Sequence, residues 1–216
     1  IKSILQNTID HKWQSLNVML VLCGSSVSFM LNEVLGYSSR LYGRRTANME
    51  LKPLTYLQAA NFYKNYSNVD KITAYCILGG IPYYLKVFND NISIKENIEK
   101  NIFNDVGLLN EEPQLLLKQE FREPTIYNSI IEAIATGSSK FNEIASKINE
   151  ETSKCSSYIK NLQEVRIVTK QIPYGENLNS KKSIYVLSDF YFRFWYKYVF
   201  SNASILSLIG AKEYTE

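Results

Sequence analysis

The first part of the chain combines one amphipathic stretch with one continuous apolar run. Over residues 1–14, apolar side chains at spacings of one to four predict a helix, and these are Ile4, Leu5, Ile9 and Trp13. Residues 18–23 form the apolar run VMLVLC, closed by Gly24, which is typical of a strand buried on both faces of a parallel sheet. Such a strand needs parallel neighbours, and no run of similar quality follows before residue 165. We therefore expect its neighbours in sequence upstream of residue 1.

Helical patterns dominate the residues that follow. The predicted helices share apolar residues at helical spacing and cover residues 27–35, 53–66, 69–78 and 83–118. Ser25 or Ser26 is placed to cap the first of them. A polar loop at residues 36–45, dense in Tyr, Ser and Arg, is a candidate site. Gly79 and Gly80 end the helix at 69–78.

From Glu123 the pattern changes to a compact unit of three short helices and a hairpin. The helices are predicted at residues 125–136, 140–148 and 152–165, and the strands at residues 167–172 and 183–187. This order defines a winged helix. Residues 190–200 then contain eight aromatic side chains in one run, FYFRFWYKYVF, which predicts a helix packed deeply against another domain.

Composition excludes several classes of protein. The chain has 24 basic and 21 acidic residues, a net charge of +3, so no strong field points to nucleic acid or an anionic membrane. Its apolar runs are too short to span a membrane. Cys23, Cys76 and Cys155 lie far apart and His11 is the one histidine, which argues against a disulfide framework and a zinc site. We expect reduced thiols in a cytoplasmic protein, and, because Ile1 is not a methionine, a chain cut from a longer one.

Four separated motifs in order carry a resemblance to a known family. They are LVLCGSS at 20–26, LYGRRT at 41–46, LGGIPYYL at 78–85, and a winged helix that ends in YVLSDF at 185–190 and FRFW at 192–195. In this order they resemble the archaeal-type ATPase family, of the STAND branch of AAA-type ATPases, which often continues into a nuclease-like domain of unknown function. The resemblance spans nearly the whole chain.

The resemblance implies a mainly α (α+β) fold, the C-terminal remnant of an AAA-type α/β core with a helical lid, followed by a winged helix. The expected domains are the end of the ATPase core at 1–50, the lid at 51–120, the winged helix at 121–189 and the truncated start of a further domain at 190–216. It also implies Walker A and Walker B motifs upstream. No GxxxxGK[ST] pattern occurs here, so no phosphate-cradling loop and no catalytic residue is assigned. ATP and Mg²⁺ are expected in the full-length protein and not in this fragment.

Candidate nucleotide-sensing residues follow from the resemblance, each with a structural alternative. Ser25 or Ser26 would sense the γ-phosphate from the end of the strand, or would only cap the next helix. Arg44 and Arg45 would neutralise phosphate charge, or would belong to a solvated loop or an ion pair. Gly80 and Pro82 resemble a GxP motif beside the adenine, and a helix break explains the same residues without a ligand.

A second function, of a different class, is a DNA-binding winged-helix regulator with a helical dimerisation domain. Its candidate DNA contacts are Lys154, Ser157, Lys160 and Asn161 on the third helix and Lys170, Lys181 and Lys182 on the wing. The region is only mildly basic, and Glu150, Glu151 and Glu164 flank the helix, so a regulatory winged helix that packs on protein is favoured. Asp189 and Glu213 are isolated carboxylates, and we assign no nuclease site. Expected partners are the missing N-terminal region, DNA, or a protein partner or second copy, and no membrane.

Overall fold

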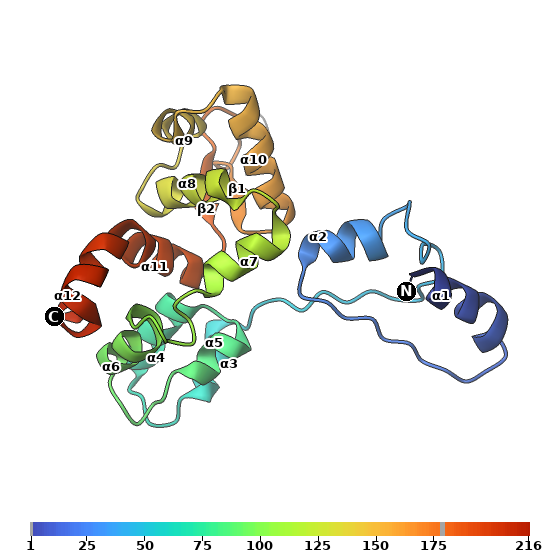
Figure 1. Ribbon diagram of the computed structural model, residues 1–216, viewed down its shortest axis with the longest axis horizontal. Helices are drawn as coiled ribbons and strands as arrows, with labels where there is room; N and C mark the ends of the chain where they lie inside the picture. The colour runs from blue at the N-terminus through green and yellow to red at the C-terminus, as the bar shows by residue number, and fades with distance from the viewer. Residues whose placement is uncertain (1, 178–179) are drawn as a thin grey trace. The chain divides into compact units, whose positions relative to one another are not determined.

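The computed structural model describes residues 2–177 and 180–216, which form two compact units, Ile1–Leu51 and Lys52–Glu216 (Figure 1). Among the described residues, helices dominate and the single sheet has two strands. The predicted fold class, mainly α with a small β component, is confirmed. The chain divides after Leu51, and the further boundaries expected at residues 120 and 189 stay predictions.

The first unit consists of two short helices and irregular connections. Helix α1 (Lys2–Thr8) continues into a π-helical turn (Ile9–Trp13), and α2 (Val27–Phe29) continues into a second π-helical turn (Met30–Val34). The helices predicted at 1–14 and 27–35 are therefore confirmed in position. None of their described residues is buried, and Leu41 is the buried apolar residue of this unit.

The strand predicted at residues 18–23 is wrong for this structure. The segment is irregular and exposed, with 88% of the surface of Met19 and 68% of that of Val21 open to solvent. A strand is held by backbone hydrogen bonds to a neighbour. Among the described residues the sheet pairs only β1 and β2, both in the second unit, so the apolar run has no partner strand.

The second unit opens with a cluster of short helices. They are α3 (Tyr56–Ala59) with a 3₁₀ turn (Ala60–Phe62), α4 (Asn68–Leu78), α5 (Pro82–Val87), α6 (Ile94–Ile98) with a π-helical turn (Glu99–Phe103), and α7 (Glu112–Glu120). The helical pattern predicted over 83–118 is thus divided into three helices. Ser93 and Glu96 form a capping box that starts α6, and Pro113 lies in the first turn of α7, so each helix has its own start signal.

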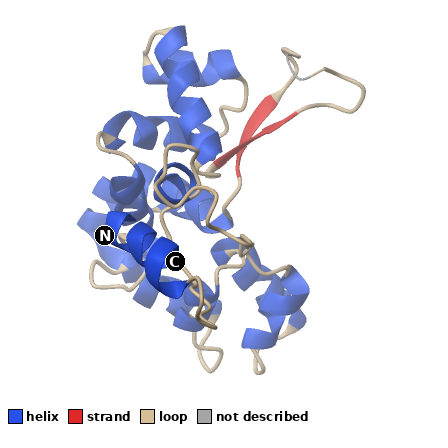
Figure 2. Cartoon of the chain, turned by 90° about the vertical axis from the view of Figure 1, so that its right-hand side faces the viewer, coloured by secondary structure: helices blue, strands red, loops and turns tan. Residues whose placement is uncertain are grey.

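Three helices and an antiparallel hairpin follow in the predicted order. They are α8 (Pro124–Ala135), α9 (Phe141–Ile148), α10 (Thr152–Glu164), β1 (Val168–Gln171) and β2 (Ile184–Leu187). Val168 pairs with Leu187 and Gln171 with Ile184, and Figure 2 shows the two strands as the red hairpin. On α10, one face buries Cys155, Ile159 and Leu162. This spacing of three and four residues is what anchors the helix to the core.

The aromatic run forms α11 (Phe190–Tyr198), followed by a 3₁₀ turn (Phe200–Asn202) and α12 (Ala203–Thr215), which is kinked at Gly210. The side chain of Asp189 caps α11 by accepting a hydrogen bond from the Phe192 N–H at 3.0 Å. Helix α11 packs against both α4 and α8, and its apolar side chains belong to one continuous core. In the described part of the chain, no helix combines the length and the apolar character needed to cross a bilayer.

Candidate functional site

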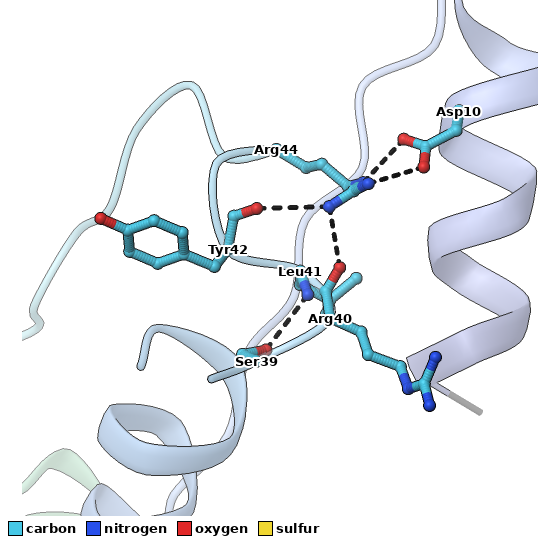
Figure 3. Close-up of polar contacts among 6 residues, drawn as sticks. All are labelled: Asp10, Ser39, Arg40, Leu41, Tyr42 and Arg44. Atoms are coloured by element: carbon cyan, nitrogen blue, oxygen red, sulfur yellow. Dashed lines mark hydrogen bonds and ion pairs between the residues drawn. The ribbon is translucent and has the colours of Figure 1, made fainter. Parts of the chain in front are cut away.

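Arg44 lies at the centre of the polar loop that the sequence singles out, and it is paired with Asp10 (Figure 3). Its Nε donates to Asp10 Oδ1 at 2.6 Å and its Nη2 to Asp10 Oδ2 at 2.7 Å. Its Nη1 donates to the backbone oxygens of Arg40 at 3.0 Å and Tyr42 at 3.3 Å. Gly43 has a φ of +76°, a conformation that a residue with a Cβ adopts only with strain, and this turn brings Arg44 back over its own loop.

The pairing shifts the ionisation of both groups. The hydrogen bond from Arg44 lowers the pKa of the Asp10 carboxyl, and the same bond raises the pKa of the Arg44 guanidinium. The guanidinium therefore holds a carboxylate and two carbonyl oxygens of its own protein. In this arrangement Arg44 has the ion-pair role that we weighed as its alternative, and its role towards phosphate stays a prediction.

The neighbouring arginines are oriented differently. Arg45 and Arg40 are exposed, and Figure 3 shows the Arg40 side chain directed away from the pair of Arg44 and Asp10. The first unit contains a polar cavity of about 270 Å³, which is lined by Lys2, Ser3, Asn32, Glu33, Ser38, Ser39 and Arg40. Lys2 and Glu33 form an ion pair in it. The cavity contains neither the predicted serines nor Arg44, so the predicted sensing residues do not converge there.

Ser26 caps α2, which is the structural alternative weighed for it. Its Oγ accepts a hydrogen bond from the Phe29 N–H at 3.2 Å and lies 3.3 Å from the Oγ of Ser28. Ser25 precedes it and is exposed. A cap satisfies one of the free N–H groups at a helix start, and this local role accounts for a serine here without any ligand.

Gly80 and Pro82 join α4 to α5 by close backbone packing. The Leu54 N–H donates to the Gly80 oxygen at 2.8 Å, and a Cβ at Gly80 would lie 2.0 Å from the Leu54 oxygen. Only glycine allows this approach. Gly79 ends α4 with a φ of +67°, and Pro82 starts α5. Gly80 is buried, whereas Pro82 is exposed.

Three of the predicted DNA contacts on α10 are exposed, and the fourth is hydrogen-bonded to a neighbouring helix. Lys154, Ser157 and Lys160 are exposed. The Lys160 ammonium lies 3.9 Å from the Glu164 carboxylate, one turn along the helix. Asn161 is half-buried and donates to the Tyr127 hydroxyl on α8 at 2.8 Å, so it holds the helix to its neighbour.

The predicted DNA contacts of the hairpin also differ in exposure and in pairing. Lys181 is exposed and Lys170 is half-buried. The Lys182 ammonium lies 2.5 Å from the Glu176 carboxylate, and this bond is the first cause of the lowered pKa of Glu176. The pair reduces the positive charge that the hairpin presents.

The structure also reveals a polar cluster that sequence reasoning missed, in which the buried Tyr84 and Tyr191 lie near the half-buried Glu112 and Asp189. Burial raises the pKa of the Glu112 carboxyl, and the hydrogen bond from Tyr84 opposes that shift. Burial likewise raises the pKa of Asp189, against the backbone N–H groups of Phe192 and Tyr191. Both carboxyl groups serve helix starts. In residues 2–177 and 180–216, no three His, Cys, Asp or Glu side chains group together to hold a metal ion.

Comparison with known proteins finds similarity to a family and to a protein from an archaeon. Residues 2–88 match a family described as an ATPase domain predominantly from Archaea. The chain is 34% identical over 206 residues to an uncharacterized protein of Methanocaldococcus jannaschii, and the aligned region covers 95% of this chain and 46% of that protein. The chain thus spans a little under half the length of the curated relative that it matches. No solved structure matches. The match over residues 2–88 supports a relationship to an archaeal-type ATPase family.

Proposed function

We propose that the chain is the regulatory C-terminal part of a STAND-type ATPase, in which ATP and Mg²⁺ are bound by other segments of the full-length protein. Residues 124–187, here called the hairpin segment, act as its winged helix. The observation that carries the proposal is the family match over residues 2–88, which contains three of the four motifs on which the resemblance rests.

The exposed apolar run at residues 18–23 supports the same proposal. The run is apolar throughout and includes the strand formers Val18 and Val21, and Met19 and Val21 are exposed by 88% and 68%. A parallel strand buried on both faces accounts for an uninterrupted run of this kind. We infer that strands from another segment of the full-length protein flank it and complete the sheet of the ATPase core.

As arranged, three of the predicted sensing residues are engaged within the chain itself. Four hydrogen bonds use the guanidinium of Arg44, Ser26 caps α2, and Gly80 is closed against Leu54. In the proposal, Arg44 contacts phosphate only after it has separated from Asp10. Arg45, Ser25, Ser26 and Pro82 have the nucleotide-sensing roles that the resemblance implies. We derive no step of hydrolysis through these residues.

Calorimetric titration of the full-length protein with ATP and Mg²⁺ tests the proposal. The wild-type protein should bind the nucleotide, and Arg44→Ala should weaken binding about tenfold or more, because one charge-assisted contact to phosphate is lost. Arg40→Ala is the control for loss of one positive charge in the same loop, because the Arg40 side chain is exposed and is directed away from the pair of Arg44 and Asp10. Absence of nucleotide binding by the full-length protein would contradict the proposal.

A second candidate function, DNA binding, is supported by one observation. Lys154 and Ser157 are exposed on α10, the helix that reads the major groove in DNA-binding winged helices, and Lys181 is exposed on the hairpin. Against it, Lys160 and Lys182 are paired with Glu164 and Glu176. We therefore favour a winged helix that packs on protein, and a gel-shift measurement with duplex DNA distinguishes the two.

A further inference from the structure

Helix α11 lies between the two halves of the second unit. On one side is the helical segment, residues 56–120, and on the other is the hairpin segment, residues 124–187. Helix α11 packs against α4 of the helical segment and against α8 and β2 of the hairpin segment. Tyr191, Phe192, Trp195 and Tyr196 are each no more than 3% exposed. The helix is thus part of the core of both segments.

Two aromatic side chains of α11 bind the backbone just before α7. The Tyr191 hydroxyl donates to the Leu109 oxygen at 2.5 Å, and the Trp195 indole N–H donates to the Asn110 oxygen at 2.5 Å. Leu109 is fully buried. A buried carbonyl that loses its donor cannot turn to water instead, so these bonds resist separation of α11 from the helical segment.

Ring contacts extend the attachment along the helical segment. Phe190 meets Tyr75 of α4 edge to face at 5.6 Å between ring centroids, and the Tyr191 ring lies 5.0 Å from that of Tyr84 on α5. One turn further on, Phe194 stacks on Phe103. Side chains three and four residues apart on α11 therefore contact α4, α5 and the turn after α6.

The opposite side of α11 is bonded to α8 in the hairpin segment. The Tyr196 hydroxyl donates to Asn128 Oδ1 at 2.5 Å, and the Ser201 hydroxyl, just beyond the helix, donates to Glu132 Oε1 at 2.8 Å. Next to the junction of the segments, the rings of Phe121 and Tyr127 stack with centroids 3.8 Å apart. Residues on both sides of the junction at 121–123 are therefore hydrogen-bonded to the same helix.

We propose that α11 locks the helical segment and the hairpin segment into one cooperative body, so that a signal reaching residues 52–216 moves both together. The regulatory role of this body rests on the proposed function, in which the hairpin segment is the winged helix that responds to the signal. The lock itself needs no nucleotide. A movement of the winged helix would then originate outside residues 52–216 and not at the junction of the two segments.

The same substitution, Tyr→Phe, made separately at three positions of α11, tests the lock in the 216-residue chain. The measurement is hydrogen exchange followed by mass spectrometry. Tyr191→Phe removes the bond to the helical segment, Tyr196→Phe removes the bond to the hairpin segment, and Tyr198→Phe is the matched control, because Tyr198 is 40% exposed. If the body is cooperative, Tyr191→Phe and Tyr196→Phe should each accelerate exchange about tenfold in both α4 and α8. Tyr198→Phe should leave exchange unchanged.

Two results would overturn the lock. One is acceleration confined to α4 in Tyr191→Phe and to α8 in Tyr196→Phe, and the other is no acceleration in either variant. Urea unfolding of the wild-type chain, followed by exchange in the same peptides, does not depend on the variants folding. It should show one common midpoint for α4 and α8, and two separated midpoints would also overturn the proposal. Since ATP is absent from these measurements, their failure leaves the proposed ATPase function untouched.

Discussion

Arg44 and Asp10, 34 residues apart, form a two-pronged ion pair that fixes the polar loop at residues 36–45 to the turn after α1. A planar guanidinium matches both oxygens of a carboxylate, which lysine does not. The sequence singled out Arg44 because of its positive charge, and in the structure its partner is the Asp10 carboxylate. Its partner, Asp10, gave no signal in the sequence.

The pair should make the loop sensitive to acid. Because the folded-state pKa of Asp10 is lowered from 3.8, its stabilising effect is present above that value and is lost as the pH falls through the lower folded value. Hydrogen exchange in residues 36–45 should therefore increase in acid once corrected for intrinsic rates. Asp10→Asn should give the same increase at pH 7, and Arg45→Ala should not. A loop equally protected in Asp10→Asn would show that the pair does not hold it.

Gly80→Ala should destabilise the second unit even when no nucleotide is present. A Cβ there would lie 2.0 Å from the Leu54 oxygen, so the backbone must shift, at a cost of about 1–3 kcal/mol. The measurement is urea unfolding followed by circular dichroism. Gly24→Ala is the control, because a Cβ at Gly24 meets only the flexible side chain of Met30. An unchanged midpoint for Gly80→Ala would argue that this glycine serves a ligand and not the packing of Leu54.

Val21→Asp should have different effects in the two proteins, because residues 18–23 are exposed in this chain and are proposed to form a buried strand in the full-length protein. Val21 is 68% exposed here, so the substitution should change the stability of the 216-residue chain by less than about 0.5 kcal/mol. In the full-length protein it should cost roughly 3 kcal/mol or more, because a carboxylate would enter the interior of a sheet. Thermal unfolding of both proteins gives the comparison. Equal and small effects in both would refute the buried strand.

Lys154→Ala distinguishes the two proposed roles of the hairpin segment. If the segment reads DNA, this change should weaken duplex binding and reduce the salt slope by about one. Lys95→Ala removes an equal charge from an exposed position of the helical segment and serves as the control. We expect neither variant to matter, because the wild-type chain should show no tight binding. Tight, salt-sensitive retardation of duplex DNA, lost only in Lys154→Ala, would reverse that choice.

Much of the second unit could be predicted from sequence, because its signals are local. The apolar spacing of Cys155, Ile159 and Leu162 predicted α10, and the aromatic run at residues 190–200 predicted the burial of α11. The hairpin strands followed from their flanking turn residues.

The remaining features depend on contacts between distant residues. The pairing of Arg44 with Asp10 and the bonds from Tyr191 and Trp195 to Leu109 and Asn110 join positions 34 to 85 residues apart, and no spacing rule reveals them. The strand at residues 18–23 failed for a related reason. An apolar run reports that a segment is suited to a sheet, whereas a strand also requires a neighbour to bond with.

Nucleotide chemistry is proposed for the full-length protein and not for this chain, and a side-by-side assay of ATP hydrolysis compares the two. The chain contains no GxxxxGK[ST] loop to cradle phosphate. At equal concentration with Mg²⁺, the full-length protein should release phosphate from ATP, and the purified 216-residue chain should release it no faster than buffer. Steady phosphate release by the 216-residue chain itself would contradict the account.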